Sequence, residues 1–307
     1  MKKQNDAQLG CLDSYILDNT PERIRDRYHG LLSYAQKINF GVLDHDVVVL
    51  DTEATGLSFV HDELIQVAAA RMCDGEIVDW YVTFVNPSKP IPDEVVHLTH
   101  ITNDMVADAP EADEALAALV DFVGDTPVVA HNANFDRTFC TKYPAGSKLK
   151  DNIWIDSLDL ARIALPRMKS HRLLDLVRAF GGPESTHRAD DDVTSTCLVY
   201  RVLLAAVAQM PAELVRHIAA LRSVEEWNTA FVFKSLQDEN AAPLNVKGLR
   251  RRAALSSLNI LRHDAFSSSI EDVSRETLDG DGFSNDTVSR ETLETSADFT
   301  DHGDDQG

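Results

Sequence analysis

The sequence predicts an α/β domain built on a mixed five-stranded sheet with helices on its faces. Three observations carry this prediction: an apolar run that ends in acidic residues, a hairpin signal between two further β-like runs, and a later alternation of strand-like and helix-like segments. Antiparallel pairing followed by such alternation is typical of a mixed sheet. We place the limits of this domain near residues 45 and 209.

The first predicted strand is Asp46–Asp51, whose sequence DVVVLD is the apolar run. Two β-like runs follow at Leu64–Met72 and Ile77–Val85. The Asp-Gly pair within Cys73–Glu76, which joins them, is a hairpin signal. Two short strands complete the predicted sheet, Thr126–His131 and Ile153–Asp156.

Helices are predicted where apolar residues recur with helical spacing. They cover Glu111–Val123, Asn134–Tyr143, Ser157–Leu165, His171–Phe180 and a last strong helix from about Asp190 to Gln209. Gly181-Gly182 is a stop signal for the fourth of them. Before the domain, Pro21–Lys37 is predicted as a helix with Thr20 as its N-cap and Pro21 at the first position.

Segments outside residues 45–209 differ in composition. Residues 1–44 form a polar N-terminal extension, and residues 210–265 form a helical extension with a basic cluster. Residues 266–307 form an acidic tail with few large apolar side chains, which predicts disorder. The net charge is −21, and about half of it lies in this tail. Such acidity makes tight nucleic-acid binding less expected but does not exclude catalysis on nucleic acid.

Cysteine spacing and hydropathy bear on the compartment. The four cysteines are far apart and show no C-x-x-C spacing, which favours reduced cytoplasmic thiols over disulfides or a zinc site. No stretch approaches the ~20 apolar residues that span a membrane, and the N-terminus lacks the apolar run of a secretory signal. We therefore expect a cytoplasmic protein without a membrane partner.

Two carboxylates end the first predicted strand. Asp51 and Glu53 are two positions apart, so they share one face of the strand at a separation of about 6–7 Å. Carboxylate oxygens of this kind suit Mg²⁺ or Mn²⁺. By itself, such a pair of acids more often lies at the solvated rim of a sheet. Gly56 follows in a turn, where it would let a nucleotide approach the backbone closely.

Further candidates follow later strands and helices. Asp136 falls in the first turn of a predicted helix, where an acid also favours the helix dipole. His187 falls in a loop after Gly181-Gly182-Pro183, and Asp192 falls in the first turn of the last helix. Asp190 and Asp191 are alternatives to Asp192 as dipole-stabilising or functional acids, and Asp192 is chosen by spacing only.

In order along the chain, DTEATG, HNANFD and HRADDD resemble the motifs of the DEDDh (DnaQ-like) exonuclease family. This family includes the proofreading epsilon subunit of bacterial DNA polymerase III. The resemblance covers about half of the chain and implies a ribonuclease-H-like fold. It also implies 3′→5′ hydrolysis that releases nucleoside 5′-monophosphates, with two divalent ions, Mg²⁺ or Mn²⁺.

The resemblance also implies roles for single residues. Asp51, Glu53 and Asp192 would ligate metal directly, Asp136 would hold the second ion more weakly, and His187 would be the general base. The terminal nucleotide and its surroundings would involve Thr55, Gly56, Leu57, His131, Asn132 and Phe135. For Phe135, packing in the core is the favoured interpretation.

Alternatives remain open for substrate and partner. Single-stranded DNA 3′ ends are the leading substrate, in proofreading or repair, and an exoribonuclease that trims RNA 3′ ends is the main alternative. A DNA polymerase is a candidate partner. A catalytically inactive interaction module with this fold is a further alternative, which the intact set of four acids and a histidine disfavours.

The tail contains the hexapeptide VSRETL twice, at Val273–Leu278 and Val288–Leu293. In a disordered tail, such a repeat suggests a short linear motif for a partner. One back-translation of its first five residues begins with GTTTCACGTGAAAC, a perfect inverted repeat that resembles the centromere-like site of bacterial chromosome segregation. We favour the interpretation that the peptide repeat is a by-product of DNA sites within the gene. Synonymous codons that break the palindrome in both copies would exclude this interpretation.

Overall fold

The computed structural model describes residues 12–182, 188–237 and 244–245. Its main sheet has five strands in the order β4-β3-β2-β5-β6. β3 is antiparallel to both neighbours, whereas β5 and β6 run parallel to β2. The strands are β2 (Val47–Ala54), β3 (Leu64–Cys73), β4 (Glu76–Phe84), β5 (Val128–Ala130) and β6 (Trp154–Asp156). This is the ribonuclease-H-like arrangement, and the predicted mixed five-stranded sheet is confirmed.

The predicted hairpin joins β3 to β4. Asp74 and Gly75 form its tip with positive φ angles of 53° and 79°. Asp tolerates this left-handed region and glycine adopts it freely, which is why Asp-Gly serves here.

Every residue of β2 is buried, because the strand lies in the middle of the sheet with helices on both faces. Successive side chains of a strand point to opposite faces. Val47 and Val49 accordingly join one hydrophobic cluster, and Val48 and Leu50 join the other. The apolar run in the sequence is explained by burial on both sides.

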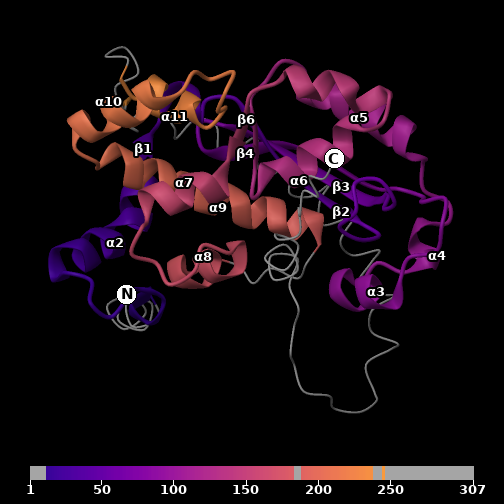
Figure 1. Ribbon diagram of the computed structural model, residues 1–307, viewed down its shortest axis with the longest axis horizontal. Coiled ribbons are helices and arrows are strands. Elements are labelled where there is room, and N and C mark those ends of the chain that lie inside the picture. The colour runs from indigo at the N-terminus through magenta and orange to yellow at the C-terminus, as the bar shows by residue number, and fades with distance from the viewer. Residues whose placement is uncertain (1–11, 183–187, 238–243, 246–307) are drawn as a thin grey trace, which may run out of the picture. The chain divides into compact units, whose positions relative to one another are not determined.

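Two sets of helices cover the two faces. The cluster around Val48 includes side chains of α5 (Ala112–Val123) and α6 (Ala133–Thr141). The cluster around Val49 includes side chains of α7 (Ser157–Ala164), α8 (Leu173–Phe180) and α9 (Ala189–Ala208). Figure 1 shows α9 running across the molecule beside α7 and α8. Between β4 and α5 lie two short helices, α3 (Asp93–Thr99) and α4 (Asn103–Val106).

Helices outside residues 45–209 contribute to the same core. Tyr28 and Leu31 of α2 (Glu22–Ala35) are fully buried in the cluster that α9 occupies. α10 (Ala212–Leu221) and α11 (Ala230–Ser235) join that cluster through Val215 and Phe233. The described parts of both flanks therefore pack on the central domain.

The start of α2 differs from the prediction. The helix begins at Glu22 with Pro21 as its N-cap, and no side chain caps it. Thr20 is therefore one position too early to act as the cap.

Several predictions lie outside the described residues. They concern His187, the basic cluster of residues 247–262, the acidic tail of residues 266–307 and its VSRETL copies. Among the described residues, no single helix is long and apolar enough to cross a membrane. α9 and α10 pass that test only together, across a 113° bend, and α9 is largely buried in the core.

Candidate active site

Three buried carboxylates from two elements meet at one end of the sheet. Asp51 and Glu53 are on β2, and Asp192 is in the first turn of α9. Each offers an oxygen, and these oxygens all lie within 4.8 Å of one another. Asp51 and Glu53 share the strand face of Val47 and Val49, which α9 covers. The alternation of β2 therefore directs both acids towards Asp192.

Gln66 holds the first turn of α9 against the sheet. This residue of β3 pairs with Glu53 across the strands and is fully buried. Its side-chain oxygen accepts the N–H of Ala189 at 3.2 Å, and its side-chain nitrogen donates to Asp190 Oδ1 at 3.3 Å. An amide both accepts and donates, so glutamine meets both needs. The lone polar residue in the apolar run LIQVAAA was the signal that sequence reasoning missed.

The three consecutive acids of α9 differ in environment. Asp190 is engaged by Gln66 and by Arg188, whose Nε lies 3.5 Å from it. Asp191 is half-buried outside the three-carboxylate cluster. Asp192 is the acid that lies with Asp51 and Glu53, as its spacing in the sequence predicted.

Asp136 approaches β2 from α6, on the other face. It is fully buried, and its Oδ1 accepts the backbone N–H of Thr52 at 2.9 Å and the Thr52 hydroxyl at 2.8 Å. Thr52 lies between Asp51 and Glu53 in sequence, so this pair of bonds fixes the strand at the point where both acids project. Sequence reasoning named Asp136 but missed Thr52, whose hydroxyl gives no pattern in a single sequence.

The chemistry of the cluster fits a hard divalent cation. Carboxylates within 4.8 Å of one another repel each other by at least about 3 kcal/mol per pair at an effective dielectric constant of ~20. A divalent cation converts this repulsion into attraction, and carboxylate oxygens are the ligands that Mg²⁺ and Mn²⁺ prefer. The residues present therefore suit the metal that the family resemblance implies.

The turn after β2 is closed by its own hydrogen bonds. The N–H of Thr55 donates to Glu63 O at 2.8 Å, and its hydroxyl donates to Asp62 Oδ1 at 3.1 Å. A Cβ at Gly56 would lie 2.5 Å from Asp62 Oδ2. A side chain at this position would therefore force the Asp62 carboxylate to shift, a constraint that the sequence did not indicate. Leu57 is half-buried and packs on the cluster that contains Phe135.

His131 and Asn132 brace the entry to α6. His131 is buried, with Nδ1 2.9 Å from Ser157 Oγ and Nε2 3.0 Å from His171 O. Asn132 has a φ of 67°, in the left-handed region, and its N–H donates to Asp156 Oδ1 at 3.1 Å. Burial raises the pKa of the Asp156 carboxyl to about 6, and this effect exceeds the opposite effect of the hydrogen bonds that stabilise its charged form. Both residues therefore position the helix that carries Asp136.

Phe135 lies in an aromatic group. Its ring centroid is 4.7 Å from that of Phe139 and 5.9 Å from that of Phe59. The side chain is 4% exposed, in agreement with the favoured interpretation of core packing.

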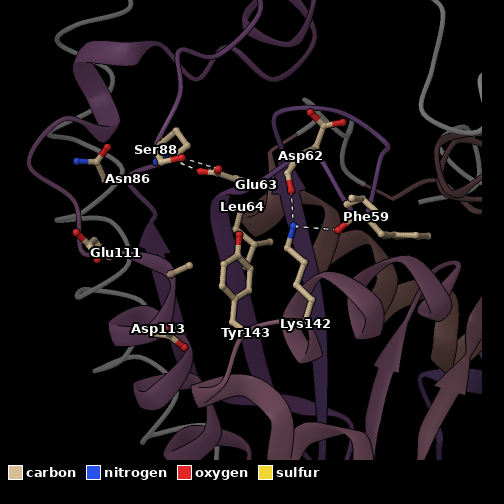
Figure 2. A pocket seen from close by; sticks show the side chains of 13 residues that line it. Phe59, Asp62, Glu63, Leu64, Asn86, Ser88, Glu111, Asp113, Lys142 and Tyr143 are labelled. Atoms are coloured by element: carbon tan, nitrogen blue, oxygen red, sulfur yellow. Dashed lines mark hydrogen bonds between the residues drawn. The ribbon is translucent and has the colours of Figure 1, made fainter.

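A pocket of about 660 Å³ lies beside this aromatic group, between the loop of residues 55–63 and the end of α6. Figure 2 shows Lys142 reaching towards the loop, where it donates to the carbonyls of Asp62 and Phe59. Much of the remaining lining is acidic, from Asp62, Glu63, Glu111 and Asp113. Acidic walls repel phosphate, and the lining includes none of the three clustered carboxylates.

The ribonuclease-H-like sheet and the carboxylate cluster at its end define a nuclease of the phosphodiester-hydrolase class. Residues 48–200 match the model of the exonuclease family, and the chain belongs to this family through that domain.

Curated relatives are similar over the same region. The PolC-type DNA polymerase III of Bacillus cereus is 45% identical over 128 residues, 41% of this chain and 9% of the relative. That of Clostridium perfringens is 35% identical over 204 residues, 65% of this chain and 13% of the relative. The chain thus spans about a tenth of the length of these relatives.

Among solved structures, exonuclease X in complex with 5′ overhanging duplex DNA has a TM-score of 0.43 and 24% identity. The match covers 61% of this chain and 99% of that one.

Proposed function

We propose that the chain is a metal-dependent 3′→5′ exonuclease that releases nucleoside 5′-monophosphates from single-stranded DNA 3′ ends. The observation that carries this proposal is the buried cluster of Asp51, Glu53 and Asp192 within an exonuclease-family domain. Three acids buried within 4.8 Å of one another indicate a cation site, because their mutual repulsion otherwise destabilises the fold.

In this proposal, Asp51, Glu53 and Asp192 hold two divalent ions, Mg²⁺ or Mn²⁺, with Asp136 as a weaker fourth carboxylate. When bound, the ions would supply positive charge that neutralises the scissile phosphate and favours deprotonation of the attacking water. The chain's own residues keep the carboxylates in place: Thr52 fixes Asp136, and Gln66 fixes the first turn of α9.

The proton of the attacking water goes to His187 in this proposal. Histidine has an ordinary pKa near 6.5, so a neutral imidazole is available as a base near neutral pH. The role rests on the resemblance of HRADDD to the family motif.

Contacts to the terminal nucleotide are assigned to the turn after β2 and the start of α6. In this proposal the half-buried side chain of Leu57 meets the terminal base, and Thr55 and Gly56 shape the turn. His131 and Asn132 position the start of α6 through Ser157 and Asp156, and Phe135 packs against Phe59 of the loop that follows the turn.

DNA is favoured over RNA as substrate because the curated relatives are DNA polymerases. The same similarity makes a DNA polymerase the partner that we propose. RNA trimming is kept as an arm of the test.

The test uses 5′-labelled single-stranded DNA and RNA of one sequence, with Mg²⁺, Mn²⁺ or EDTA. We expect a ladder that shortens from the 3′ end of DNA and disappears with EDTA. Asp192→Asn should reduce the rate by at least about 100-fold, as the loss of a group that stabilises the transition state does. Asp191→Asn is the matched control and should keep most of the activity.

Internal cuts, release from the 5′ end, or full activity in Asp192→Asn would contradict the proposal. If the RNA is shortened faster than the DNA, RNA and not DNA is the substrate.

A further inference from the structure

Three different donor side chains meet at the opposite end of β2 from the carboxylate cluster. His45 precedes the strand, and Cys73 and Asp74 lie at the tip of the β3–β4 hairpin. A ring nitrogen, the thiol sulfur and a carboxylate oxygen of these residues all lie within 4.8 Å of one another. The strand from Val47 to Asp51 separates the two clusters and by itself spans about 13 Å.

We propose that His45, Cys73 and Asp74 form a second metal site, selective for Zn²⁺ or a similar borderline cation. Thiolate and imidazole ligands suit Zn²⁺ and disfavour Mg²⁺, which prefers oxygen. Three protein ligands leave a fourth position for water in a tetrahedral site. The proposal is independent of the exonuclease function.

The geometry requires only small side-chain movements. Zn²⁺ bonds of about 2.0–2.3 Å place tetrahedral ligand atoms about 3.3–3.8 Å apart. His45 Nδ1 and Asp74 Oδ1 are now 2.8 Å apart, and the widest separation in the trio is within 4.8 Å. The His45 side chain is 64% exposed, so the site is open to solvent.

The backbone around the trio is held in place. The N–H of Asp74 donates to His45 O at 3.3 Å, and the N–H of Gly75 donates to Asp44 O at 3.1 Å. These bonds tie the hairpin tip to the chain before β2. The Arg201 side chain lies directly against Gly75. A Cβ at position 75 would be only 0.9 Å from Arg201 Nη1.

The surrounding groups support a bound cation. Asn39 Nδ2 donates to Asp74 Oδ1 at 3.1 Å and so orients the carboxylate. Metal ligands are commonly oriented by such outer hydrogen bonds. Arg201 lies beside the hairpin, where its positive charge would repel a metal ion. It is paired with the buried Asp44 at 3.2 Å, and the negative charge of Asp44 offsets this repulsion.

The test is a titration of the full chain with Co²⁺, a spectroscopic substitute for Zn²⁺. A thiolate ligand gives cobalt an intense near-ultraviolet charge-transfer band, and the three clustered carboxylates of the other site contribute no sulfur. We expect one such band that saturates at one ion per chain and is displaced by Zn²⁺. Zn²⁺ alone should raise the Tm, since it binds the folded state and joins two segments.

Conservative variants locate the site. Cys73→Ser should abolish the band, and His45→Gln or Asp74→Asn should weaken binding by more than about 10-fold. Asparagine tolerates the positive φ of position 74, so that variant keeps the hairpin. Glu76→Gln, an exposed acid in the same hairpin, is the control and should bind as the wild type does. Absence of the band in the wild type, or its retention in Cys73→Ser, would overturn the proposal.

Discussion

Replacing Gln66 by alanine tests whether the first turn of α9 depends on β3 for its place. The variant removes the acceptor of the Ala189 N–H and the donor to Asp190. A buried donor left without its partner costs about 1–3 kcal/mol, and a hydrogen bond to a charged group contributes about 1.5–3 kcal/mol. Since both bonds exceed 3.1 Å, we take the lower ends and expect a loss of about 2–3 kcal/mol in the free energy of unfolding.

The same change should weaken metal binding and catalysis. Asp192 lies three residues after Ala189, so a shift of this turn moves it away from Asp51 and Glu53. A displacement of 1 Å in a catalytic group costs about 100-fold in rate. We expect kcat/KM on single-stranded DNA to fall about 10- to 100-fold and to recover partly at high Mn²⁺ concentration.

A matched control separates position from stability. Val48→Ala removes buried methyl groups from β2 on the opposite face of the sheet and should also destabilise the fold, but should leave the metal dependence unchanged. Urea unfolding gives the stability, and activity against Mn²⁺ concentration gives the metal dependence. A Gln66→Ala protein with wild-type activity and half-saturation by metal would refute the reasoning.

Further predictions concern the supports of the site. The pKa of Asp156 is raised from 3.8 to about 6, so the folded state binds this proton more tightly than the unfolded state does. The free energy of unfolding should therefore fall by about 3 kcal/mol as pH rises from about 4 to 6. Asp156→Asn keeps an acceptor oxygen and should remove that slope in urea unfolding; an unchanged slope would contradict it. Thr52→Val deletes the hydroxyl bond to Asp136 and should cost about 1 kcal/mol in thermal unfolding and lower activity, whereas Thr52→Ser should keep both. Gly56→Ala forces a Cβ against Asp62 and should raise KM for DNA; wild-type KM would show that the turn adjusts.

Much of the fold was predictable because its signals are local. The run DVVVLD, the Asp-Gly hairpin and the alternation of later segments identified all five strands of the main sheet and the helices after them to within about three residues. Spacing of two along β2 placed Asp51 and Glu53 on one face, and spacing within the family motif selected Asp192 from three adjacent acids. Periodicity is a property of neighbouring residues, so a single sequence contains it.

The tertiary structure decided what depends on contacts between distant residues. Gln66 meets α9 across more than a hundred residues of sequence, and Thr52 meets Asp136 across 84. Thr55 and His131, expected beside substrate, have polar atoms engaged by Glu63 and by Ser157, respectively. A hydrogen-bond partner is chosen by folding geometry, which leaves no pattern along the chain.

The cysteines show the same division. Spacing along the sequence disfavoured a zinc site, because no two cysteines are close enough for a paired motif. Folding brings Cys73 to His45 through a hairpin, and a donor set of mixed type arises from two separate segments. The sequence by itself determined the elements and the acids at their ends, whereas the packing of those elements determined which side chains meet.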